Sequence, residues 1–203
     1  MKRLRSLLAA LLVGCACSIA ANPDPAFDPL TANIEENIAT PAVPDKQSAA
    51  VTTAMGHLVS RLRESGYHVD AVRKGEVVMV TIQCAKLFAP NSTTLLPDGT
   101  KLLAGLAPYI QRSDNYKVIL AVHTDNTGDD IYSEKITADR ANAIDEYYYR
   151  ANGNHDTDII PYGLGSDEPV APNTGMANRE KNRRVEIYFV PTQQLIDKIR
   201  NKK

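Results

Sequence analysis

The sequence lacks an excess of either charge. Its 203 residues include 23 lysines and arginines and 24 aspartates and glutamates. Proteins that bind nucleic acid without sequence preference need a positive surface that neutralises phosphates, so we expect no nucleic-acid binding. The content of 43% hydrophobic and 23% charged residues is instead typical of a folded domain with a solvated surface.

Cysteine and histidine are also scarce, with three and four residues. Three cysteines cannot form a framework of several disulfides, although one bridge between Cys17 and Cys84 is possible. No group of these residues has the spacing of metal ligands, so we expect no metal and no other cofactor. The simplest interpretation of Cys84 is a small buried hydrophobic residue.

The chain begins with an export signal. Three of the first five residues are basic, and residues 7–21 carry no charge, which is the pattern of a secretory signal peptide. The uncharged run is too short for a membrane-spanning helix. Within it the sequence Leu-Val-Gly-Cys ends at Cys15 and resembles the lipobox of bacterial lipoproteins, which implies that residues 1–14 are removed and Cys15 carries a lipid. Cleavage after Ala20 or Ala21 is the alternative, because small residues precede both positions.

A proline-rich segment follows the signal. Residues 22–44 contain five prolines among polar residues and show little apolar periodicity. Such a composition favours an extended linker. We therefore expect residues 15–44 to be a tether and the folded region to begin at Asp45.

Strands and helices alternate from Asp45 onward, which favours one mixed sheet with helices packed on it. The predicted helices are 45–66, one that begins at 97 and that Pro108 should kink or end, and 131–150. The predicted strands are 67–72, 76–82, 118–122, 159–162 and 184–189. We predict an α+β fold, a two-layer α/β sandwich. Its expected parts are an N-terminal helix and hairpin strand at 45–76, a main domain at 77–190, and a basic tail at 191–203 that forms a solvated helix.

One charged residue interrupts the apolar stripe of the helix at 131–150. Arg140 lies four residues from both Ile136 and Ile144, so it shares their buried face. A buried guanidinium needs an anionic partner, and Asp125 in the loop at 123–128 is the leading candidate. From the residues alone, such a pair is equally consistent with a ligand site and with a structural salt bridge.

Four spaced motifs suggest what this loop and helix do. They are His-Thr-Asp-Asn-Thr-Gly at 123–128, Ile-Thr and Arg-Ala at 136–137 and 140–141, Tyr-Gly-Leu-Gly-Ser at 162–166, and Asn-Arg-Arg-Val-Glu-Ile at 182–187. In this order they resemble the OmpA-like C-terminal domain, the peptidoglycan-binding module of many Gram-negative envelope proteins. The resemblance runs from about residue 77 to residue 187 and implies a β-α-β-α-β-β fold.

The resemblance also implies a ligand and the residues that hold it. In the family, an aspartate and an arginine at the positions of Asp125 and Arg140 hold the diaminopimelate of the peptidoglycan stem peptide. A carboxylate suits the ligand's ammonium, and the guanidinium fork suits its carboxylate. The further positions that the resemblance assigns to this site are Thr124, Asn126, Thr127, Ser133 and Asn91.

Some positions depart from the family pattern. Ser133 replaces the usual asparagine, and Pro90 and Asn91 stand where aromatic and acidic residues are common. The two neighbouring arginines at 183 and 184 are either cations of the site wall or structural partners of glutamates. We favour the structural role for Arg184 and leave both roles open for Arg183.

The sequence gives little support to an enzyme or to a calcium-binding protein. No serine or cysteine forms a nucleophile motif with His123, and Asp130 stands where a calcium loop needs glycine. We predict a protein that is not an enzyme. It is expected to be lipid-anchored in the outer membrane, to face the periplasm, and to tether that membrane to the cell wall by binding peptidoglycan. The alternative is an envelope lipoprotein that binds and regulates another envelope protein.

Overall fold

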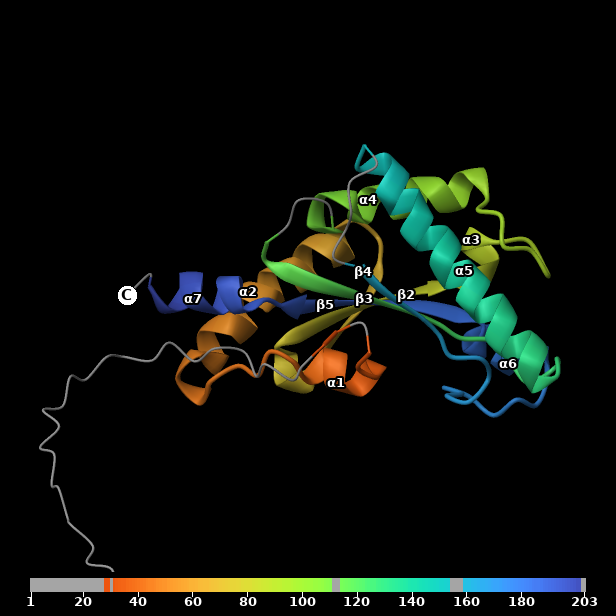
Figure 1. Ribbon diagram of the computed structural model, residues 1–203, viewed down its shortest axis with the longest axis horizontal. Coiled ribbons are helices and arrows are strands. Elements are labelled where there is room, and N and C mark those ends of the chain that lie inside the picture. Colours follow the sequence, from red (N-terminus) through yellow and green to blue (C-terminus); the bar gives the residue numbers. More distant parts are fainter. Residues whose placement is uncertain (1–27, 30, 111–113, 154–158, 202–203) are drawn as a thin grey trace, which may run out of the picture.

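A five-stranded mixed sheet is the centre of the protein (Figure 1). The computed structural model describes residues 28–29, 31–110, 114–153 and 159–201, so the expected signal peptide and Cys15 lie outside the described residues. The strands are β1 (His68–Val72), β2 (Val77–Gln83), β3 (Tyr116–Val122), β4 (Ile159–Gly163) and β5 (Arg184–Pro191). Their order is β1-β2-β5-β3-β4, with β3 and β4 parallel and all other neighbours antiparallel.

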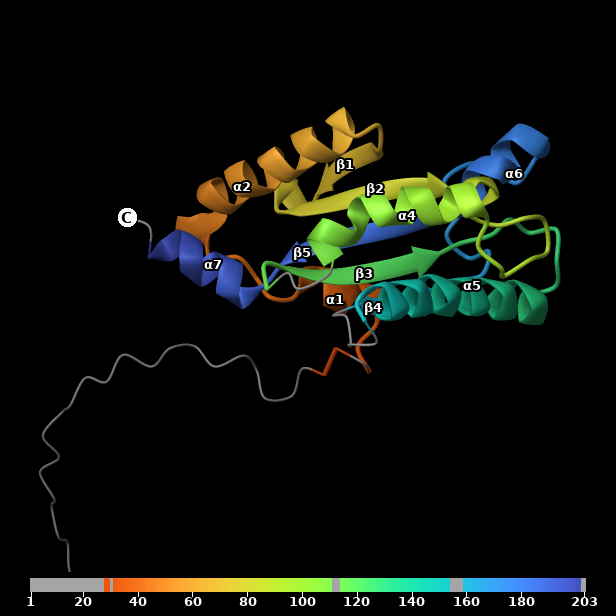
Figure 2. The ribbon, with the colours of Figure 1, turned by 90° about the horizontal axis from the view of Figure 1, so that it is seen from above.

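Three long helices cover one face of this sheet, as Figure 2 shows. They are α2 (Asp45–Glu64), α4 (Pro97–Ile110) and α5 (Asp130–Ala151). The shorter elements are α1 (Ile34–Ala39), η1 (Arg73–Gly75), α3 (Cys84–Leu87), α6 (Met176–Asn182) and α7 (Gln193–Arg200). Within the described part of the chain, no helix is long and apolar enough to cross a membrane. The predicted α+β fold with a mixed sheet is therefore confirmed.

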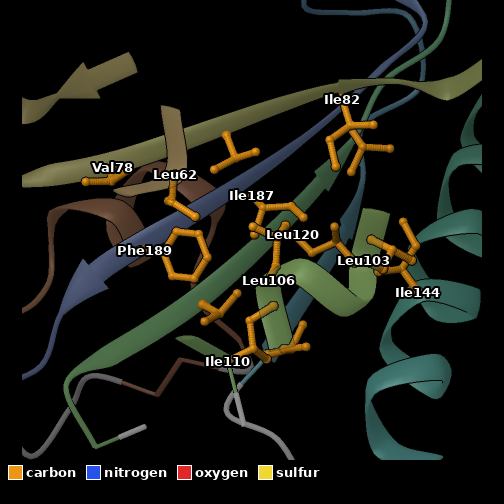
Figure 3. Packing of buried hydrophobic residues seen from close by; sticks show 14 of the residues in the cluster. Leu62, Val78, Ile82, Leu103, Leu106, Ile110, Leu120, Ile144, Ile187 and Phe189 are labelled. Carbon is orange, nitrogen blue, oxygen red and sulfur yellow. The ribbon is translucent and has the colours of Figure 1, made fainter. Parts of the chain in front are cut away.

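The main core lies between these helices and the sheet (Figure 3). Alternate residues of β5, Val185, Ile187 and Phe189, face it, as their period of two predicts. Helix α5 contributes Ile144 and Tyr148, two members of the predicted apolar stripe. The regular hydrophobic patterns thus identified both layers correctly.

The opposite face of β5 carries two buried charged residues, Arg184 and Glu186. Arg184 Nε donates to Glu186 Oε1 at 2.6 Å, and the Tyr188 hydroxyl donates to Glu186 Oε2 at 2.6 Å. Burial raises the pKa of Glu186, but His123, Tyr188 and Arg184 outweigh burial and lower it to about 2. Arg184 therefore has the structural role that we favoured.

The expected tether is wrong for its last part, because α1 folds within it. Asn33 and Glu36 form a capping box at the start of α1. The apolar side of α1 packs on the second face of the sheet, against Ile119 and Val190. The folded region therefore begins near Asn33 and not at Asp45.

Lys117 of β3 and Arg73 of η1 hold the C-terminal end of α1 by hydrogen bonds to its backbone. Lys117 Nζ donates to the Thr40 carbonyl at 2.6 Å, and Arg73 Nη1 donates to the Ile38 carbonyl at 2.6 Å. These bonds satisfy carbonyl groups that a six-residue helix leaves free at its C-terminus.

The C-terminal tail is also more ordered than a solvated helix. In α7, Ile196 is fully buried, and Leu195 and Ile199 pack against the main core beside α2. The expectation of a solvated tail is wrong because the three apolar residues share one side of the helix.

Pro108 does not end α4. The helix includes this proline and continues to Ile110.

Candidate functional site

A pocket of about 280 Å³ opens at the end of the molecule opposite α7, where α3, α6 and the N-terminal end of α5 meet (Figure 1). The loop that follows β3 forms one wall, and the segment after α3 forms another. Six of the seven residues that the family resemblance assigned to the ligand line this pocket. They are Asn91, Thr124, Asp125, Thr127, Ser133 and Arg140. Asn126 is exposed and does not line it.

Close backbone packing positions α5 against this pocket. Gly163 at the end of β4 lies so near α5 that a β-carbon there would come within 2.2 Å of the Ala138 nitrogen. The next turn is tied to the same helix, because the Gly165 N–H donates to Thr137 Oγ1 at 3.0 Å. The Thr124 N–H in turn donates to the Gly165 carbonyl at 2.8 Å. The loop with Asp125 and the helix with Arg140 therefore share one rigid support.

Asp125 is a buried carboxylate whose two oxygens are both occupied. Oδ1 accepts the Thr127 N–H at 2.8 Å and also the Thr127 hydroxyl, and Oδ2 accepts Nη1 of Arg183. Burial disfavours the charged form, but the hydrogen bonds from Thr127 and Arg183 outweigh it and lower the pKa of Asp125. The group is therefore an anion at neutral pH.

The expected ion pair between Asp125 and Arg140 is wrong, because Arg183 takes the place of Arg140. Arg140 Nε donates to the Ser92 carbonyl at 2.9 Å, and Nη2 donates to the Ala89 carbonyl at 3.4 Å. Its guanidinium carbon lies 5.1 Å from the centre of the Phe88 ring. Arg140 is only 6% exposed, and within the described residues it forms no ion pair with a carboxylate.

Arg140 is thus a buried cation supported only by neutral groups. Carbonyl dipoles and an aromatic face stabilise a guanidinium, but they do not neutralise its charge. Two cations and one anion line the pocket, and the one anion is already paired with Arg183. The remaining positive charge leaves Arg140 able to pair with an anionic group in the pocket.

The remaining positions shape the walls. Asn91 adopts φ 54°, a left-handed conformation that asparagine tolerates, and its Oδ1 accepts the Tyr132 hydroxyl at 3.2 Å. Ser133, at the position of the usual asparagine, is buried. Its hydroxyl offers one hydrogen-bond donor, where an asparagine amide would offer two.

Several wall residues were not predicted as part of a site, among them Phe88, Tyr132 and Cys84. Burial raises the pKa of the Cys84 thiol to about 11 despite the nearby arginines, so the thiol is neutral. Cys84 is a free and buried cysteine, as expected from its simplest interpretation. No motif marked Tyr132, whose hydroxyl bonds to the distant Asn91. Phe88 lies in the segment 87–95, which loosely resembles the family's segment between its first strand and first helix, but nothing there indicated its contact with Arg140.

His123 adjoins the loop but is buried elsewhere. Its Nε2 lies 3.4 Å from Glu186 Oε2. The side chain is 1% exposed and does not line the pocket. His123 therefore supports the buried polar cluster on β5 and not the chemistry of the pocket.

Comparisons with known proteins show what the chain is similar to. Residues 87–183 match the OmpA family. The chain is 38% identical over 107 residues to the outer-membrane lipoprotein YfiB of Pseudomonas aeruginosa, with 53% of this chain and 62% of the relative covered. It is 33% identical over 100 residues to the peptidoglycan-binding protein ArfA of Mycobacterium tuberculosis, with 49% of this chain and 30% of the relative covered.

A solved structure of the cell wall anchor of the T6SS from Pseudomonas aeruginosa shares the fold. It has a TM-score of 0.55 and 25% identity, and the match covers 66% of this chain and 94% of that chain. The chain spans less than two thirds of the length of both curated relatives.

Proposed function

Because residues 87–183 match the OmpA family, we propose that this protein is an envelope lipoprotein that binds the stem peptides of peptidoglycan without chemical conversion. The names of two relatives, an outer-membrane lipoprotein and a peptidoglycan-binding protein, support this proposal. The domain supplies the wall-binding end of the molecule.

One observation carries the proposal: a buried cation without a carboxylate partner and a buried carboxylate line the same pocket. Arg140 and Asp125 offer one charge of each sign to a bound molecule. The side-chain end of diaminopimelate presents an ammonium and a carboxylate together. Its carboxylate would pair with Arg140 and its ammonium with Asp125, so that each buried charge gains a partner.

The remaining parts of the proposal concern the anchor. Lipid at Cys15 would hold the chain in the outer membrane, with the domain in the periplasm. The segment between Cys15 and Asn33 can extend to at most about 60 Å, so the pocket samples a limited volume of cell wall. Many binding sites lie within that volume, and a high effective concentration makes individually weak contacts sufficient for a tether.

Co-sedimentation with purified sacculi tests this function. The chain from residue 16 onward retains every described element and should pellet with diaminopimelate-type sacculi. We expect Asp125→Asn and Arg140→Gln to weaken binding by at least about 30-fold, because each leaves a charge of the ligand or the protein buried without a partner.

Two surface variants on the same helix serve as matched controls. Asp139→Asn and Arg150→Gln each remove one exposed charge of α5 that does not line the pocket. Both should bind as the wild type does, and thermal melts verify that all four variants fold. Equal pelleting of all variants would show that binding does not use the pocket.

One observation favours the alternative, binding to another envelope protein. Large apolar side chains are exposed at the pocket end of the molecule, with Ile131 81%, Met176 79% and Val170 59% exposed. If the wild type does not pellet with sacculi, this surface becomes the first candidate for a protein partner.

A further inference from the structure

The site holds a second cation whose position conflicts with the proposed ligand. Arg183 Nη1 already donates to the Asp125 oxygen that is not bonded to Thr127. Because both bonds from Thr127 go to the other oxygen, an ammonium that pairs with Asp125 meets Arg183 at this oxygen and competes with it. Two cations would then compete for one carboxylate.

The exposure of the two side chains shows which of them can move. The side chain of Arg183 is 35% exposed, whereas that of Asp125 is 2% exposed. Asp125 is held in place by Thr127, and Arg183 reaches it from the rim of the pocket. A guanidinium at the rim can leave its partner and regain hydration at once, which keeps the cost of the move small.

The backbone of Arg183 is held on both sides, so only its side chain is free to turn. Its N–H donates to the Arg179 carbonyl at 3.0 Å, and its carbonyl accepts the Cys84 N–H at 2.9 Å. The residue lies between the end of α6 and the start of β5. A rotation about its side-chain bonds opens Asp125 without any change in the sheet.

We propose that Arg183 is a removable latch: it neutralises Asp125 in the free protein and gives way to the ammonium of the bound stem peptide. This inference rests on the proposed function. The exchange keeps the buried carboxylate paired with a cation before and after binding, so no uncompensated buried charge arises. It also makes Arg183 a specificity-determining residue, because a ligand without a free ammonium cannot replace the latch.

The test compares two synthetic tripeptides, one with free diaminopimelate and one with the side-chain amine of diaminopimelate acetylated. Calorimetry measures the Kd of each for the wild type and Arg183→Gln. We expect Arg183→Gln to bind the free-amine peptide about five-fold more tightly than the wild type does, because the competing ion pair is gone. Binding of the acetylated peptide should not become tighter.

Arg179→Gln is the matched control, because it removes an arginine of the preceding helix α6 that does not line the pocket. It should bind both peptides as the wild type does. If Arg183→Gln does not fold, Arg183→Lys keeps a cation with a less favourable geometry for Asp125. It should show the same direction of change at a smaller size.

Nuclear magnetic resonance of the arginine side chains gives a readout that does not depend on variants. Saturation of the wild type with the free-amine peptide should shift the guanidinium signal of Arg183 to that of a solvated arginine, and the acetylated peptide should leave it unchanged. An unchanged signal in both cases, or a weaker affinity of Arg183→Gln for the free-amine peptide, would overturn the latch while binding to the wild type still stands. If the wild type binds neither peptide, the proposed function itself is wrong, and the latch falls with it.

Discussion

Gly163 allows a sharp test of how the pocket is supported. A β-carbon at this position would lie 2.2 Å from the Ala138 nitrogen, 2.5 Å from its Cα and 2.8 Å from the Thr137 carbonyl carbon. All three are backbone atoms, so no side chain can rotate away, and either α5 or the end of β4 has to move. We expect Gly163→Ala to lower the free energy of unfolding by about 3 kcal/mol or more. This corresponds to a fall in Tm of roughly 6–12 °C for a chain of this size.

The displacement should also reach the pocket. Helix α5 carries Arg140, and the turn after β4 is bonded to Thr137 of the same helix. An outward shift of α5 would therefore separate Arg140 from the Ser92 carbonyl that now orients it. Weaker binding to sacculi should accompany the loss of stability in any fraction that still folds.

Urea unfolding measures the stability, and Gly56→Ala is the control. Gly56 lies in α2, and nothing stands within 4 Å of a β-carbon built on it. Alanine is preferred over glycine inside a helix, so this variant should gain roughly 0.5–1 kcal/mol. If Gly163→Ala unfolds at the same urea concentration as the wild type, the close contact between β4 and α5 does not constrain the fold.

Three further predictions concern stability. The pKa of Glu186 is lowered from 4.5 to about 2, so its charged form should contribute about 3 kcal/mol at neutral pH that is lost as the pH falls from 4.5 through 2. The stability difference between wild type and Glu186→Gln, from urea unfolding at several pH values, should shrink over this range, and a constant difference would contradict the argument. Ile196→Ala should lower the free energy of unfolding by about 2–5 kcal/mol through the loss of buried volume in α7. An unchanged Tm in a thermal melt would show that α7 does not pack on the core. Asn37→Ala removes hydrogen bonds at 2.7 Å to the Tyr162 hydroxyl and at 2.8 Å to the Pro29 carbonyl, and it should cost about 1–3 kcal/mol in urea unfolding. An unchanged midpoint would show that α1 contributes nothing to the fold.

Regular patterns made most of the fold predictable from the sequence. The five strands were predicted within about two residues of their observed ends, because continuous or alternating apolar residues mark buried strands. The stripe on α5 predicted that Arg140 faces inward, which the structure confirms. Both inferences use contacts that repeat along one element, and sequence periodicity records such contacts directly.

The elements that escaped prediction are short or depend on distant partners. Six-residue α1 cannot display a helical period, and its apolar residues find their place only through Ile119 and Val190 of other elements. The partner of Asp125 escaped for the same reason, since Arg183 lies 58 residues away in the chain. Opposite charge alone could not decide between Arg140 and Arg183.

The hydrogen bonds that hold the C-terminal end of α1 have a mechanical consequence for the tether proposed above. Lys117, near the start of β3, holds the backbone at Thr40, and Asp125 follows the other end of the same strand. Tension between an N-terminal anchor and a ligand in the pocket would therefore run lengthwise along β3. This strand is hydrogen-bonded to β4 on one side and β5 on the other, and these bonds lie across the direction of pull. The hydrogen bonds of β3 would therefore be loaded in shear and would share the force, so that they would have to break together and not one after another.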